Sequence, residues 1–76
     1  MTQLQAERRE KREILRSIYG GMMTIADLTR ELGYTNQRST KRWVDSVEAP
    51  ATMIGTRKRF DTDVIARILV DRRGMA

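Results

Sequence analysis

The chain has 76 residues and a formal net charge of +5, with 15 lysine and arginine residues against 10 aspartate and glutamate residues. A chain of this length buries one small hydrophobic core, so we expect a single globular unit. The sequence contains no cysteine and no histidine, which excludes disulfides, thiolate chemistry, zinc sites built on those residues and histidine-based acid or base catalysis. We therefore expect a protein that is not an enzyme and binds no cofactor.

The sequence shows neither a signal-peptide pattern nor an apolar run of membrane-spanning length. We therefore expect a cytoplasmic protein with no membrane partner. The positive charge is unevenly distributed, because residues 34–60 hold six basic and two acidic side chains whereas the rest of the chain is nearly balanced. A local excess of this sign attracts polyanions such as duplex DNA.

Residues 4–19 are good helix formers, and Gly20 and Gly21 provide a stop. We expect this helix to pack only through its C-terminal half, where Ile14, Leu15, Ile18 and Tyr19 form an apolar face. Its basic residues alternate with glutamates, which favours a solvated face over the alternative of an auxiliary phosphate-binding arm. We expect residues 1–21 to form an N-terminal helical extension and residues 22–76 to form the DNA-binding domain.

A second helix is predicted from Ile25 to Leu32, with Thr24 as N-cap, Asp27 at the third helical position and Gly33 as the stop. After a turn at residues 34–37, a third helix is predicted over residues 38–47. Its apolar stripe is formed by Thr40, Trp43, Val44 and Val47.

Trp43 is expected to anchor the third helix in the core rather than to stack on bases. Tyr34, beside the turn, is expected to pack inward, with a hydroxyl contact to a phosphate as the alternative. The helical period gathers a charged set on the side opposite the stripe: Arg38, Lys41, Arg42 and Asp45. A short helix followed by an amphipathic helix with a basic face is suited to the major groove of DNA.

Pro50 prevents a helix from continuing, and two short runs, residues 51–54 and 57–60, flank Gly55-Thr56. This pattern predicts a two-residue hairpin, and a glycine at the first turn position suits a type II′ turn. Three basic residues follow the tip: Arg57, Lys58 and Arg59. They could lie on phosphates or in a narrow minor groove, or they could simply protect a solvated edge strand.

A last helix is predicted after Asp61, its N-cap, with Phe60 stapled onto Ile65. It is expected to end at Gly74. Its apolar face consists of Val64, Ile65, Ile68 and Leu69. The predicted fold class is therefore mainly α with a small β-hairpin, a winged helix-turn-helix of three to four helices plus the wing.

Residues 23–70 resemble the excisionase-type winged helix-turn-helix family, which is related to the DNA-binding heads of MerR-like regulators. The matching motifs are Thr24-Ile25-Ala26-Asp27-Leu28, Leu32-Gly33, Arg42-Trp43-Val44, Pro50-Ala51, Ile54-Gly55 with the basic run to Arg59, and Phe60 ahead of Asp63. The turn at residues 34–37 is about one residue longer than the family pattern, and the N-terminal extension is additional.

The resemblance implies that the second helix of the motif enters the major groove and that the wing lies along the backbone or minor groove. It assigns the helix role to Arg38, Ser39, Lys41 and Arg42, and the wing role to Arg57, Lys58 and Arg59. It further implies an excisionase, or recombination directionality factor, that binds double-stranded DNA cooperatively, bends it and steers an integrase. The alternatives are a small transcriptional repressor of a phage or mobile element and a protein-interaction or DNA-packaging adaptor.

Overall fold

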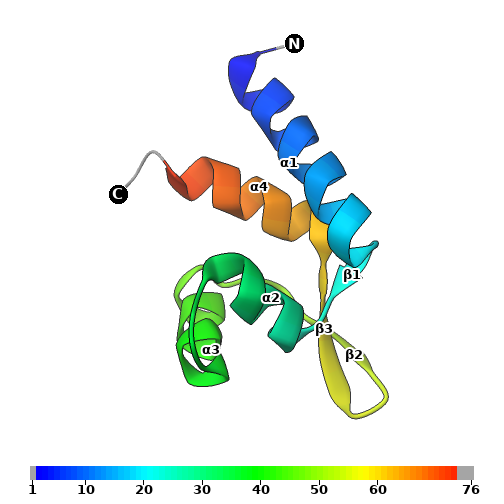
Figure 1. Cartoon of the computed structure of the whole chain (residues 1–76), viewed down its shortest axis with the longest axis vertical. Helices are drawn as coiled ribbons and strands as arrows, with labels where there is room; N and C mark the ends of the chain where they lie inside the picture. Colours follow the sequence, from blue (N-terminus) through cyan, green and yellow to red (C-terminus); the bar gives the residue numbers. More distant parts are fainter. Residues whose placement is uncertain (1, 74–76) are drawn as a thin grey trace.

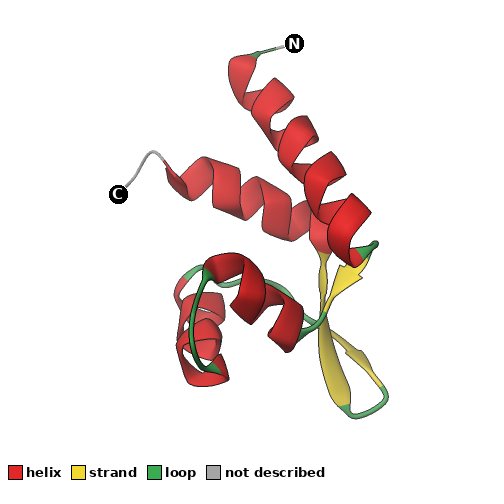
Figure 2. Cartoon of the chain, in the orientation of Figure 1, coloured by secondary structure: helices red, strands yellow, loops and turns green. Residues whose placement is uncertain are grey.

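The computed structural model describes residues 2–73, which form four helices and a three-stranded antiparallel sheet (Figure 1 and Figure 2). The prediction of a mainly helical chain with a small hairpin is confirmed for these residues. The helix end predicted at Gly74 lies outside them. In chain order the elements are α1 (Gln3–Tyr19), β1 (Met22–Met23), α2 (Ile25–Leu32), α3 (Gln37–Ser46), β2 (Thr52–Ile54), β3 (Arg57–Asp61) and α4 (Thr62–Arg73).

Helix α2 has the bounds that the sequence predicts, because both of its ends are capped by local side-chain and backbone contacts. Thr24 Oγ1 accepts a hydrogen bond from the Asp27 amide, and Asp27 Oδ2 accepts one from the Thr24 amide, each at 3.0 Å. At the other end Gly33 adopts a left-handed conformation with φ of 76°. The Tyr34 amide then donates to the Thr29 carbonyl at 3.1 Å, which closes the helix.

Helix α3 begins and ends one residue earlier than predicted. Asn36 is its N-cap, and the Asn36 Oδ1 atom accepts a hydrogen bond from the Ser39 amide at 2.9 Å. After α3, Glu48 takes the left-handed conformation with φ of 55°, and the Ala49 amide donates to the Val44 carbonyl at 3.0 Å. Asn36 is a favourable N-cap that the prediction did not use, and a C-terminal turn without glycine is a weak sequence signal.

Strand β3 is the centre of the sheet, in the order β1-β3-β2. Ile54 pairs with Arg57 across the two-residue turn, and Gly55 has φ of 65°, so the predicted hairpin is confirmed. The sequence does not predict β1, which pairs Met22 with Asp61 at the far end of β3. Two residues are too short to produce a strand pattern.

One hydrophobic core receives a side chain from α1, β1, α2, β3 and α4, and its fully buried members are Leu15, Met23, Leu28, Phe60, Ile65 and Ala66. Leu15 lies in the same cluster as the other five, so α1 covers the core. Thr62 fixes the junction between α1 and the sheet, because its hydroxyl donates to the Gly20 carbonyl at 2.7 Å and its amide donates to the Gly21 carbonyl at 3.0 Å.

The predicted packing of α1 is wrong in two respects. Ile14 and Ile18, which are predicted on the buried face, are 46% and 58% exposed. The N-terminal half also packs, since Arg8 forms a two-pronged ion pair with Asp71 of α4 at 2.8 and 2.9 Å. The buried stripe of α1 is centred on Leu15. Towards the N-terminus, the residues on the same side of the helix are charged side chains, and the isoleucines lie outside this stripe.

The start of α4 is as predicted, since Asp61 Oδ1 accepts the Asp63 amide at 2.8 Å and Phe60 and Ile65 are buried in one cluster. Within the apolar face of α4, Val64, Ile68 and Leu69 are only half-buried. The missed residues Ala66 and Val70 are buried. In α3 the fully buried side chain is Thr40, whereas Trp43 is half-buried and packs against the edge of the core.

Candidate nucleic-acid interface

Helix α3 presents three cations to solvent because its opposite side is held against α2. The Thr29 and Thr40 hydroxyls share a hydrogen bond of 2.6 Å between the two helices, and Thr40 is fully buried. Half a turn away, Arg38, Lys41 and Arg42 are exposed. Ser39 is half-buried, so it is the least accessible of the four predicted helix residues.

The hairpin carries the other three predicted cations on β3. Arg57 and Lys58 are exposed, whereas Arg59, closer to the base of the hairpin, is half-buried. The Arg59 guanidinium donates from Nη1 to the Lys58 carbonyl at 3.2 Å. In Figure 1, α3 and the hairpin tip lie at the lower end of the molecule, and α1 and α4 lie at the upper end.

A hollow of about 430 Å³ joins the helix to the hairpin. It is lined by Lys41 of α3 and by all three hairpin cations, so the structure brings four of the seven predicted residues together. The other lining residues come from the start of α2 and the start of α3: Thr24, Ile25, Ala26 and Gln37.

Gln37 is the functional candidate that the sequence analysis missed. The sequence predicts Gln37 in the turn before α3, but it is the first residue of that helix and lines the hollow beside Lys41. The signal that could have found it is Asn36, whose spacing to Ser39 fits an N-cap. The approach of the α2 N-terminus to the hairpin has no sequence signal.

The remaining predicted residues lie elsewhere around α3. Ser39 and Arg42 line a separate hollow of about 350 Å³ together with Tyr34, Trp43 and Ser46. Tyr34 is 40% exposed, so it does not pack inward as expected. Arg38 lines neither hollow and is exposed near the beginning of α3. The seven residues therefore follow the outer side of α3 and the hairpin and do not converge on one point.

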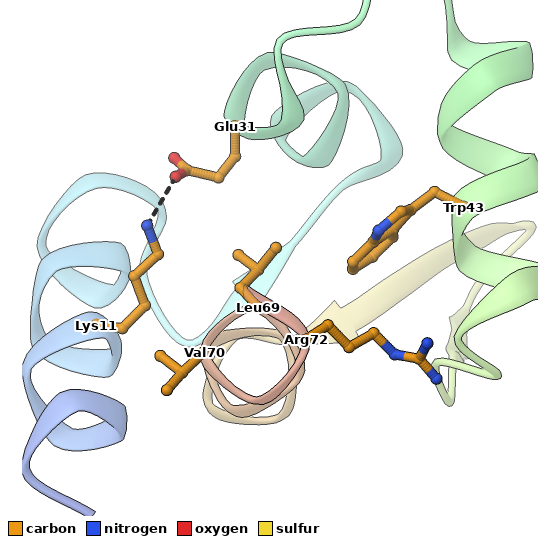
Figure 3. Close-up of a pocket in the computed structure, with 6 residues that line it drawn as sticks. All are labelled: Lys11, Glu31, Trp43, Leu69, Val70 and Arg72. Carbon is orange, nitrogen blue, oxygen red and sulfur yellow. Dashed lines mark hydrogen bonds and ion pairs between the residues drawn. The ribbon is translucent and has the colours of Figure 1, made fainter. Parts of the chain in front are cut away.

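Trp43 extends from α3 towards α4. It lines a third hollow with Leu69, Val70 and Arg72, which also contains the Lys11–Glu31 ion pair (Figure 3). In Figure 3 the indole ring points from α3 towards the α4 side chains. Glu31 also accepts a hydrogen bond from the Tyr19 hydroxyl at 3.1 Å. The pKa of Tyr19 is raised, mainly because the hydroxyl is partly desolvated and secondly because of this hydrogen bond.

The ion pairs distinguish the cations of α1 from those of α3 and the hairpin. Within residues 2–73, each ion pair takes its cation from α1: Arg8–Asp71, Arg9–Glu13, Lys11–Glu31 and Arg16–Asp63. The hydrogen-bonded Arg16 guanidinium lowers the pKa of Asp63, and the same contact raises the pKa of Arg16. None of the six cations on α3 and the hairpin pairs with a carboxylate in the described chain, so their charge is available to an external anion.

Along residues 2–73, no helix is both long and apolar enough to cross a membrane. The same part of the chain contains no cluster of three or more acidic, histidine or cysteine side chains able to hold a metal ion.

Comparison with known proteins finds no match: no family model, no curated protein and no solved structure is similar to this chain.

Proposed function

We propose that the protein binds double-stranded DNA as a winged helix-turn-helix, with α3 in the major groove and the β2–β3 hairpin on the adjacent backbone or minor groove. The observation that carries this proposal is the distribution of unpaired cations. Lys41 of α3 and the three hairpin cations surround one hollow and have no carboxylate partner within residues 2–73, whereas four of the five cations of α1 are neutralised.

The dimensions of α3 support this mode of binding. An α-helix with its side chains is about 10–12 Å across, and the major groove is about 12 Å wide and admits one helix. The Thr29–Thr40 hydrogen bond holds α3 against α2, so the backbone that carries the exposed cations is positioned before DNA binds. Arg38, Lys41 and Arg42 are the residues we propose for base and phosphate contacts, with Gln37 added and Ser39 in a lesser role.

We further propose that the protein is an architectural factor without catalysis of its own, of the excisionase or directionality-factor type. This part of the proposal is supported by the resemblance in the order of motifs between Met23 and Val70. It includes cooperative occupancy of neighbouring sites and an integrase as partner, since a single head and wing supplies too few contacts for high specificity. Footprints at an attachment region would support excision, and footprints confined to a promoter would instead indicate a repressor.

The test of DNA binding is a titration of duplex DNA at several salt concentrations. If the six cations on α3 and the hairpin all contact phosphates, the slope of log K against log salt is expected to be about −5. A slope near zero would contradict the proposal.

A further inference from the structure

The tip of the hairpin exposes two large apolar side chains. Met53 and Ile54, the last two residues of β2, are 57% and 54% exposed. Strand β2 is an edge strand, because the sheet order is β1-β3-β2. Polar or charged residues would normally protect an edge of this kind at no cost to the core. The two side chains therefore call for an explanation outside the folding of the hairpin.

The strand register places a cation beside each of these apolar side chains. Met53 is directly opposite Lys58, and Ile54 is directly opposite Arg57. Directly opposed residues share a face of an antiparallel pair, and successive residues alternate between the two faces. Each face of the tip thus presents one apolar and one basic side chain, and neither cation has an ion-pair partner in residues 2–73.

The exposed apolar residues of α1 have a different setting. Ile14 and Ile18 share their side of the helix with Glu10, as the helical period requires. An acidic neighbour disfavours contact with a polyanion. Unlike Ile14 and Ile18, the two apolar side chains of the hairpin tip each lie directly opposite an unpaired cation, which makes the tip complementary to nucleic acid.

We propose that the hairpin tip enters the minor groove of duplex DNA and that Met53 and Ile54 act as an apolar wedge against the bases. This inference rests on the proposed DNA-binding function. The minor groove is about 6 Å wide, and the two strands alone are about 4.8 Å apart, so the tip reaches the bases only where the groove opens. Arg57 and Lys58 then contact phosphates on the two sides of the minor groove, and the apolar side chains replace water at the base edges.

The wedge has a physical consequence for the DNA. Apolar side chains inserted at a base step partly unstack it and kink the duplex by roughly 20–90° towards the major groove. In this arrangement the cations supply the salt-dependent part of the affinity, and the apolar pair supplies the distortion. The two contributions are therefore separable by mutation.

The experiment uses the full chain and a short duplex with a central TpA step, which unstacks easily. The duplex is end-labelled for energy transfer and carries 2-aminopurine at that step. Met53→Thr and Ile54→Thr, alone and together, remove the wedge while keeping a residue type that is favourable in strands. The matched control is Ile18→Thr, since Ile18 is 58% exposed on α1. Thermal unfolding of each variant confirms that it is folded.

The double tip variant is expected to bind about tenfold more weakly. It should keep the native salt slope and lose both the energy-transfer change and the 2-aminopurine signal. Lys58→Gln should show the reverse pattern, with the salt slope reduced in magnitude by about 0.9 and the distortion signals retained. Ile18→Thr should match the native protein in all three measurements.

The outcomes separate this inference from the proposed function. If native protein binds with a steep salt dependence but the double tip variant distorts the duplex as strongly, the wedge is excluded and DNA binding stands. If native protein shows no salt-dependent binding of the duplex, the proposed function is excluded and the wedge with it.

Discussion

Helix α1 carries five basic side chains and α3 with the hairpin carries six, but the two regions use them differently. On α1, Arg8, Arg9, Lys11 and Arg16 each lie within 3.3 Å of a carboxylate oxygen. On α3 and the hairpin, none of the six cations has such a partner within residues 2–73. The number of basic residues in the sequence of α1 therefore overestimates the positive charge that α1 can offer to a ligand. The position of the carboxylates decides which cations remain available.

The same contrast extends to the role of each end in stability. The α1–α4 end contributes Leu15, Ile65 and Ala66 to the core and carries the interhelical ion pairs. The α3–hairpin end contributes mainly exposed side chains, with Thr40 and Phe60 as its fully buried anchors. If this division is correct, mutations at the first end should change stability, and mutations at the second should change DNA affinity.

The largest expected effect is that of Leu15→Ala on stability. Leu15 is completely buried among residues from four other elements, and truncating such a leucine costs about 2–5 kcal/mol. Denaturant unfolding measures the loss. The control is Ile14→Ala, one residue earlier and 46% exposed, for which a change within about 0.5 kcal/mol is expected. A stable Leu15→Ala variant would show that α1 is an appended helix and not part of the core.

The second prediction concerns the unpaired cations. The triple variant Lys41→Gln, Arg42→Gln, Arg57→Gln should weaken duplex binding by roughly 100-fold and reduce the salt slope by about 2.7. Its unfolding midpoint should stay near that of the native protein, because these side chains are exposed and without ion pairs in the described chain. Fluorescence anisotropy with labelled DNA measures both quantities.

The matched control for this variant removes charge from the other end of the molecule. Arg8→Gln, Arg9→Gln, Arg16→Gln deletes the same number of positive charges from α1, where each is paired with a carboxylate. We expect less than a few-fold loss of DNA affinity. An equal loss in the two triple variants would mean that net charge alone drives binding, and the comparison of the two ends would fail.

The smallest expected effect is the acid sensitivity of the α1–α4 end. Because the pKa of Asp63 is lowered by its hydrogen bond to Arg16, the folded state favours the ionised carboxylate. Its stabilising contribution is complete above the ordinary aspartate pKa of 3.8 and is lost as pH falls through the lower folded pKa. Asp63→Asn should flatten the stability profile in that acid range, as measured by urea unfolding at several pH values.

The control for the acid effect is Asp45→Asn on α3, a carboxylate without an ion pair in residues 2–73. It should leave the acid limb of the profile unchanged. High salt should also reduce the difference between native protein and Asp63→Asn, because both partners of the Arg16 pair are exposed and screened.

The elements that the sequence predicts well are those whose signals are local. Thr24, Asp27 and Gly33 fix α2 through contacts within the helix itself, and the Gly55-Thr56 turn fixes the hairpin. Strand β1 could not be predicted in this way, since Met22 and Met23 become a strand only by pairing with β3, nearly 40 residues later. The exposure of Ile14 and Ile18 follows similarly from where α4 packs on α1.

The candidate site is likewise predictable only where its residues are placed by local sequence signals. The exposed face of α3 follows from the helical period, so Arg38, Lys41 and Arg42 could be named. The hollow that unites Lys41 with the hairpin depends on how α2, α3 and the sheet pack together, and so does the inclusion of Gln37. The ion pairs that neutralise α1 are equally non-local, since Asp71 and Asp63 follow their partners by 63 and 47 positions.

Strand β3 belongs to both halves of the molecule. Phe60 and Asp61 pair with β1 beside the core, and Arg57 to Arg59 pair with β2 in the hairpin. The hairpin is therefore a direct continuation of a core strand. Preorganisation of this kind lowers the conformational entropy that binding must remove. A small protein with few contacts can in this way convert more of its interaction energy into affinity.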